Sequence, residues 1–149
     1  MNPNLSATDQ FAIISNLDPA SRLGGGFPSP FADITPWHSV VMIAQVGVFP
    51  AGATFDARLQ QCVDNSGTVT KNIAGKAITT LLAAGGDNKQ VLVNLRPDEL
   101  DLAGGFQFIR MVLNTSGTTT YCSAMLLGLS AKWSPASIAN VSSVVQLIG

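Results

Sequence analysis

The chain has 149 residues, of which 46% are hydrophobic and only 11% are charged, with a net charge of −1. An average soluble domain has roughly a quarter of its residues charged, so this low fraction predicts a surface that neighbouring subunits cover. The near-neutral balance, without any cluster of Lys or Arg, argues against a nucleic-acid-binding surface. The length fits one domain spanning residues 1–149.

Membrane and secreted proteins are also disfavoured. No apolar run approaches the roughly 18 residues of a membrane-spanning helix, and the first residues lack the basic start and apolar core of a signal peptide. We therefore expect a protein that avoids the membrane and is made and kept in a cytoplasm. Cys62 and Cys122 lack CxxC spacing and are too few for a disulfide scaffold. They indicate free, partly buried thiols, with a bridge between them as the alternative.

The N-terminal part of the chain is expected to be irregular. Residues 1–9 are polar and have no hydrophobic period, which predicts an arm, disordered or laid on a neighbour. Gln10–Ser15 is a short strand candidate. Asn16–Pro36 holds four of the eight prolines and a run of three glycines, which disfavour both helix and central strand. We expect residues 16–37 to form one long loop.

Three aromatic residues in or at the end of this loop, Phe27, Phe31 and Trp37, need an apolar environment, in the core or on a partner. Loops of this length are usually functional or flexible. We therefore assign these three side chains as candidate interface contacts.

The middle of the chain predicts strands separated by turns. His38–Phe49 is apolar on both faces, which is typical of a strand buried on both sides. Thr54–Val63 alternates between apolar and polar residues, and after the turn at residues 64–67 Thr68–Ile73 is a third strand of the same meander. Lys76–Ala84 is compatible with a short helix, but its Ile and Thr residues favour a strand.

The last third contains the clearest local pattern. Gln90–Leu95 is a strand, and Pro97–Leu100 is one helical turn with Pro and acids at its start. Phe106–Leu129 predicts two strands joined by a tight turn at Asn114–Gly117, the central hairpin of the fold. Ile138–Ile148 is a final apolar strand or arm within a C-terminal arm at residues 134–149.

Eight or nine short strands at roughly ten-residue spacing predict an all-β fold, an antiparallel β-sandwich or jelly roll with extended N- and C-terminal arms. A strand-like arm can add to the sheet edge of a neighbour. We therefore assign four apolar residues of the C-terminal arm as further candidate contacts: Val144, Val145, Leu147 and Ile148.

No catalytic constellation emerges from the residues. His38 is the single histidine, and Ser39, Cys62 and Cys122 are conceivable nucleophiles, but no local signature accompanies them. A zinc site would need further ligands at motif spacing. We interpret His38 as structural.

The acidic and glycine-rich segments also have structural explanations. Asp98, Glu99 and Asp101 could form a glycosidase pair, but acids at the start of a helical turn explain them better. Asp64 begins a turn that lacks the later ligands of a calcium loop, and the glycine groups lack phosphate-binding spacing. We expect no enzyme activity, cofactor or metal.

Arg110 lies in a strongly apolar strand, on the same face as Phe108. A guanidinium in such a place must be paired, so we expect a structural buried charge. Plausible partners are Asp56, Asp98 and Asp101 within the domain, and the alternative is a bridge to a neighbouring subunit.

The segment from Val40 to Leu129 resembles small structural proteins of tailed-bacteriophage virions. The similarity lies in a strand with a Leu-x-x-polar stretch leading to an Asp turn (Leu59 to Asp64), and in a later strand with Arg after an aromatic residue (Phe108, Arg110). The resemblance implies a capsid decoration, or cement, protein that binds the major capsid protein on the virion exterior. It also implies a homo-oligomer, with a trimer favoured, assembled in the host cytoplasm.

Two other functions stay open. A head–tail connector or tail component would differ from a decoration protein in copy number. A carbohydrate-binding β-sandwich would need exposed aromatic residues on one face, whereas the chain has one Tyr and two Trp, each Trp close to a proline.

Overall fold

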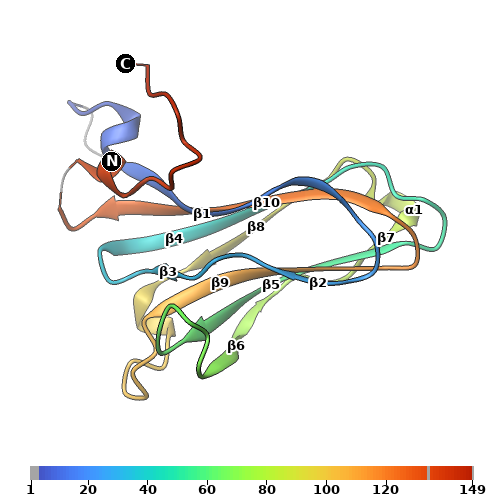
Figure 1. Cartoon of the computed structure of the whole chain (residues 1–149), viewed down its shortest axis with the longest axis horizontal. Helices are drawn as coiled ribbons and strands as arrows, with labels where there is room; N and C mark the ends of the chain where they lie inside the picture. The colour runs from blue at the N-terminus through green and yellow to red at the C-terminus, as the bar shows by residue number, and fades with distance from the viewer. Residues whose placement is uncertain (1–3, 134, 149) are drawn as a thin grey trace.

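The computed structural model describes residues 4–133 and 135–148. The outermost residues of the two predicted arms (1–3 and 149) and residue 134 lie outside this part. The fold is an antiparallel β-sandwich of two sheets, with both ends of the described chain on the outer side of one sheet (Figure 1). The predicted fold class is therefore confirmed.

Sheet A contains four strands, in the order β1 (Phe11–Arg22), β10 (Thr120–Ala131), β4 (Trp37–Val46) and β8 (Gln90–Leu95). Sheet B has the order β2 (Gly25–Pro28), β9 (Phe108–Ser116), β5 (Thr54–Cys62) and β6 (Thr70–Ala77). Two short strands extend it: β3 (Ala32–Asp33) pairs with β9, and β7 (Leu81–Leu82) pairs with β5.

The connections between strands identify the topology. Most of them cross from one sheet to the other, and β5–β6 is a hairpin within sheet B. The order of the four main strands in each sheet, β1-β10-β4-β8 facing β2-β9-β5-β6, is that of a jelly roll. Short helical turns complete the fold: η1 (Ala7–Asp9), η2 (Pro97–Glu99), η3 (Ala136–Ala139) and α1 (Ala83–Gly86).

The central hairpin is the main topological correction. The predicted strands exist as β9 and β10, but they lie in different sheets, and each pairs with strands distant in sequence. Gly117 in the connection has φ +84°, and a Cβ there would lie 2.6 Å from the Gly52 carbonyl oxygen. The connection therefore packs against the β4–β5 turn and joins the two layers. The predicted meander fails for the same reason, because β4 and β5 belong to different sheets.

The predicted long loop is also wrong, because residues 16–37 contain most of β1 and all of β2 and β3. β1 and β2 are edge strands, where a missing N–H or an irregular register is tolerated. Pro19 lies in a register shift between Leu17 and Ala20, and Pro28 ends β2. Pro19 and Pro28 therefore lie in edge strands, in a segment that was expected to be irregular.

Smaller segments differ in detail. The expected strand at Lys76–Ala84 divides into the end of β6, the short β7 and α1, whose Gly85 has φ +96° and which is a turn more than a helix. The helical turn after Pro97 is confirmed as η2. The C-terminal arm forms η3, a turn and then chain without regular secondary structure, so of the two expectations for it, strand or arm, the structure shows the arm.

The core lies between the sheets and includes Trp37, which is 2% exposed. Trp37 packs on Gly128 of β10, where an added Cβ would lie 2.3 Å from the indole ring. The assignment of Trp37 as an interface contact is therefore wrong. The other large, fully buried side chains come from both sheets and include Met42, Phe55, Leu59, Leu95, Ile109, Met111, Leu113 and Leu126.

Candidate interaction surface

The outer face of sheet A is apolar. Val40, Met42 and Ala44 of β4 point into the core, so the alternating residues between them point outward. The strand register brings outward apolar residues side by side: Val41 opposite Leu127, and Ile43 opposite both Met125 and Leu92. We call this set the apolar face; its members are Phe11, Ile13, Val41, Ile43, Leu92, Met125, Leu127 and Leu129.

This face carries no charge on three of its four strands. β4, β8 and β10 contain no Asp, Glu, Lys or Arg. Leu92 is 62% exposed, Val41 is buried at 7%, and the other members are half-buried. β4 is thus apolar on both sides, as predicted, but the sandwich covers only its inner side.

The C-terminal segment closes part of the neighbouring edge. The Asn140 side chain accepts a hydrogen bond from the Ile13 N–H (2.8 Å), and the Val141 N–H donates to the Ile13 carbonyl (2.8 Å). Val144 is half-buried in a hollow of about 270 Å³ lined by Leu17 and Met125. Figure 1 shows this segment (red) on the outer side of sheet A.

Beyond Val144 the arm is uncovered. Val145 is 88% exposed, Leu147 53% and Ile148 88%. Of the four predicted contacts of the arm, three are therefore available to a partner, and Val144 anchors the arm. Trp133 and Ile138, which sequence reasoning did not select, are 72% and 82% exposed nearby.

A groove of about 500 Å³ with several polar lining residues lies at the other end of the same face. Tyr121, 65% exposed, lines it together with the amides of Gln45, Asn88 and Gln90 and with Lys89. The carbohydrate-binding alternative requires exposed aromatic residues on one face, and this groove supplies one ring beside several amides.

The outer face of sheet B is polar and internally bonded. Arg110 Nε donates to Gln60 Oε1 (2.9 Å), and Gln60 Nε2 donates to Asn72 Oδ1 (2.9 Å). The Arg110 guanidinium lies 4.7 Å from the centre of the Phe31 ring. Arg22 lies in the same way 4.9 Å from the centre of the Phe27 ring. Phe27 and Phe31 are thus half-buried under arginines of their own chain.

The expected buried ion pair of Arg110 is not formed. Arg110 is half-buried, and within the described ranges no carboxylate lies within salt-bridge distance of it. Of its predicted partners, Asp56 accepts from Thr80, Asp98 from Arg96 and Asp101 from Lys71. An amide and an aromatic ring stabilise a partly solvated guanidinium without a carboxylate.

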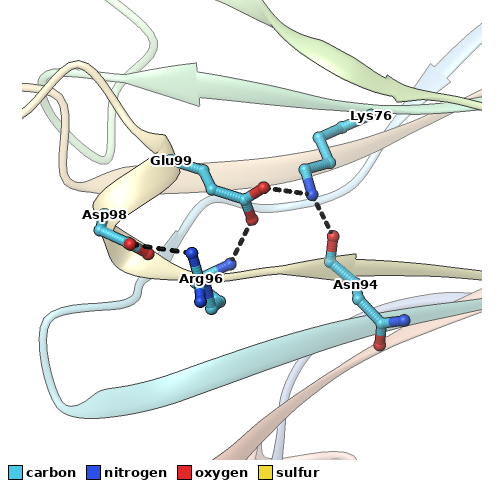
Figure 2. A network of polar contacts seen from close by, with 5 residues as sticks. All are labelled: Lys76, Asn94, Arg96, Asp98 and Glu99. Carbon is cyan, nitrogen blue, oxygen red and sulfur yellow. Dashed lines mark hydrogen bonds and ion pairs between the residues drawn. The ribbon is translucent and has the colours of Figure 1, made fainter.

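The acidic residues Asp98, Glu99 and Asp101 each form an ion pair within the chain, and Figure 2 shows those of Asp98 and Glu99. Lys76 Nζ binds Glu99 Oε1 (2.8 Å) and donates to the Asn94 carbonyl (2.7 Å), and the Arg96 N–H donates to Glu99 Oε2 (2.8 Å). The hydrogen bond from Lys76 is the main cause that lowers the pKa of Glu99. Lys71 does the same for the pKa of Asp101. A general acid needs a raised pKa, so these carboxyls are unsuited to that role.

Asp64 is bound by its own turn. Its Oδ1 accepts from the backbone N–H groups of Ser66 (2.9 Å), Gly67 (2.9 Å) and Thr68 (3.2 Å). Hydrogen bonds from Thr68, followed by those from Ser66 and Gly67, lower the pKa of Asp64 to about 2. The predicted turn is therefore formed.

The remaining candidate residues do not assemble into a site. His38 is exposed at the start of β4, and both cysteines are free, as predicted, and fully buried where partial burial was expected. Burial raises the pKa of the Cys122 thiol. No group of three or more His, Cys, Asp or Glu suited to a metal occurs among the residues described. In that same part of the chain, no helix has the length and apolar character to cross a membrane.

No family model and no curated protein matches the sequence. Among solved structures, the fold is similar to a chain of the disulfide-linked pili that form Bacillus endospore appendages (12% identity, TM-score 0.40, 89% of this chain and 100% of that one). It is also similar to a chain of infectious bursal disease virus, Gt strain (11%, 0.43, 92% and 37%). A third match is a chain of Broad Bean Stain Virus (11%, 0.43, 90% and 92%). At these TM-scores the assignment of the jelly roll rests on the strand order of this chain.

Proposed function

We propose that this chain is a non-enzymatic structural protein of a virion, which binds the outside of the capsid and stabilises the shell. The observation that carries the proposal is the apolar face of sheet A. A strand such as β4, apolar on both sides, needs a cover on both sides, and a two-layered sandwich supplies one. Monomeric soluble proteins rarely leave such a patch open, so the second cover comes from a partner.

The apolar face alone is smaller than a stable protein interface. Its four strands span about 14 Å between the outermost axes, and β8 is about 20 Å long. A flat area of about 300 Å² is well below the roughly 800 Å² per partner of a stable interface. The exposed apolar residues at Trp133, Ile138 and the C-terminal arm extend the surface toward that size.

The partner we propose is the major capsid protein, met on the virion exterior after synthesis in the host cytoplasm. Jelly rolls occur both in viral shells and in lectins, so the fold is compatible with this role. Burial of uncharged surface provides adhesion with little dependence on salt, which suits a cement.

Copy number tests the proposal. Particles are purified from cells that express a tagged chain, and quantitative mass spectrometry compares the chain with the major capsid protein. Hundreds of copies per particle support decoration, whereas about a dozen or fewer indicate a head–tail connector or tail component. Absence of the chain from the particles contradicts every virion role.

Carbohydrate binding is the second candidate, favoured by Tyr121 in its amide-lined groove. An exposed aromatic ring, together with amides that donate and accept, suits a neutral, hydroxyl-rich ligand. Glycan-array binding that is lost in Tyr121→Ala supports this function, and an array without signal rejects it.

A further inference from the structure

The edge of sheet A formed by β8 is open. The Val46 N–H donates to the Lys89 carbonyl (3.0 Å), so the hydrogen-bonded positions continue at every second residue of β8. Gln90, Leu92 and Asn94 therefore direct their N–H and C=O groups away from β4. The Asn94 carbonyl accepts from Lys76 (Figure 2), but in the described chain the backbone of Leu92 has no hydrogen-bond partner.

The other edges carry devices that prevent pairing with another chain. β1 has two register shifts and a proline, and residues 140–141 cover part of it. β2 is four residues long and ends in Pro28. β6 carries Lys71 and Lys76, and its Gly75 has φ +72°. β8 has six residues with no proline, charge or register shift, which is the type of edge that accepts an added strand.

The C-terminal arm contains a segment with the composition of a β-strand. Residues 145–148 are Val-Gln-Leu-Ile, uncharged and rich in strand-forming side chains. Val145 and Ile148 are each 88% exposed, and no hydrogen bond joins these four residues to the rest of the described chain. Val144, whose N–H donates to the Val141 carbonyl (3.0 Å), is the last anchored residue.

We propose that residues 145–148 of one copy bind β8 of a second copy as an added strand of sheet A. Main-chain hydrogen bonds to Leu92 would provide the pairing, and apolar side chains of the arm would extend the apolar face. The arm cannot serve its own β8 in this way. Four residues beyond Val144 reach at most about 14 Å, and Val144 lies at the hollow between β1 and β10, about 10 Å from β8, so the arm would use most of its length to cross the sheet and would arrive end-on.

The positions of the donated arm and of the acceptor strand limit the symmetry of the assembly. The arm leaves the molecule at β1 and the acceptor is β8, and these are opposite edges of the same sheet. If each copy donates its arm to the next, the contact is heterologous and forms a ring when the rotation between copies closes and an open filament when it does not, whereas two copies that exchange arms form an isologous dimer. Self-association of the purified chain is a separate property from binding to a shell, and it can be measured without any shell.

The decisive variant is Leu92→Pro. The Leu92 N–H points away from β4, so proline removes the donor needed by the arm and leaves the β4 ladder intact. Leu92→Val is the matched control, since it shortens the side chain and keeps the N–H. A chain that ends at Val144 removes the arm itself.

Light scattering after size-exclusion chromatography gives the oligomeric state, and circular dichroism checks the fold. We expect an oligomer for the full chain and for Leu92→Val, and a monomer for Leu92→Pro and for the truncated chain. A monomeric full chain overturns the proposal, and so does an oligomer that survives the truncation. If Leu92→Pro loses its strand signal, the truncated chain decides.

Cross-linking tests the contact directly, because both native cysteines are buried. A tagged Leu92→Cys chain is mixed under oxidising conditions with a differently tagged Val145→Cys, Gln146→Cys or Leu147→Cys chain. Added strands alternate their side chains between two faces, so we expect either Gln146→Cys alone or the other two to form disulfides with Leu92→Cys. Equal cross-linking at all three positions, or none, contradicts a paired strand.

Discussion

The two outer faces of the sandwich differ in polarity and in whether their side chains bond to one another. On sheet B, Gln60, Asn72 and Arg110 bond to one another, and Arg110 also covers Phe31. On sheet A, uncharged strands leave Ile43, Leu127 and their neighbours without a polar cover. A face whose groups satisfy one another needs no partner, whereas an apolar face gains free energy from one. The difference is the reason why our proposal assigns the partner to sheet A.

The largest effect is expected from β10, whose two sides differ most. Gly128→Val drives a side chain into Trp37 and is expected to lower the free energy of unfolding by about 3 kcal/mol. Leu127→Thr, one residue away on the outer side, removes a half-buried side chain and is expected to lower it by about 1 kcal/mol. Chemical denaturation measures both. Equal losses would show that the outer side is as tightly packed as the core.

A charge on the apolar face is expected to have the next largest effect, on assembly. Leu127→Lys places an ammonium where the partner would cover it, and we expect binding to purified particles to fall at least about tenfold. Asn72→Lys, on the exposed face of sheet B, is the matched control and is expected to bind as the unmodified chain does. Co-sedimentation measures the bound fraction. Loss in the control alone would assign binding to sheet B.

The polar contacts of sheet B are expected to contribute to stability more modestly. Arg110→Met removes the hydrogen bond to Gln60 and the contact of the charge with Phe31, which together stabilise by about 1–2 kcal/mol. Arg96→Met, which removes an exposed ion pair with Asp98, is expected to cost about 0–1 kcal/mol. Thermal unfolding compares the two variants. An equal effect would mean that Phe31 does not stabilise Arg110.

The smallest effect is expected from acid. The pKa of Asp64 is about 2 in the folded chain and 3.8 as its ordinary value, so its contribution is complete above pH 4 and is lost as the pH falls toward 2. Asp64→Asn keeps an acceptor oxygen but cannot titrate, so it should remove part of the loss of stability in that window. Unfolding followed at pH 5, 3 and 2 measures this. A curve that is identical in the variant would contradict a stabilising role for the Asp64 carboxylate.

Several local features could be predicted from the sequence. The alternation of Thr54–Val63, the acidic turn at Asp64 and the helical turn after Pro97 each depend on neighbours within a few residues, and the structure has all three. The apolar face could be predicted from the sequence only in part. His38–Phe49 was recognised as apolar on both sides, but it was interpreted as a strand with two covers.

Trp37 and the β9–β10 connection show what sequence reasoning missed. Pro36 before Trp37 indicated a loop, yet Gly128, ninety-one positions later in the chain, opens the space that buries the indole ring. The turn after Ser116 has the same residues whether it closes a hairpin or joins two layers. Its packing on Gly52 decides between them.

By itself, the sequence determined that this protein is made of short strands with few charges and contains more apolar strand surface than one core can bury. These properties depend on residue type and on the period of two along each strand. Only the tertiary structure decided which strands pair, that β9 and β10 lie in opposite layers, and that the surplus apolar surface gathers on sheet A. Strand pairing joins residues far apart in the chain, and no local pattern specifies that choice.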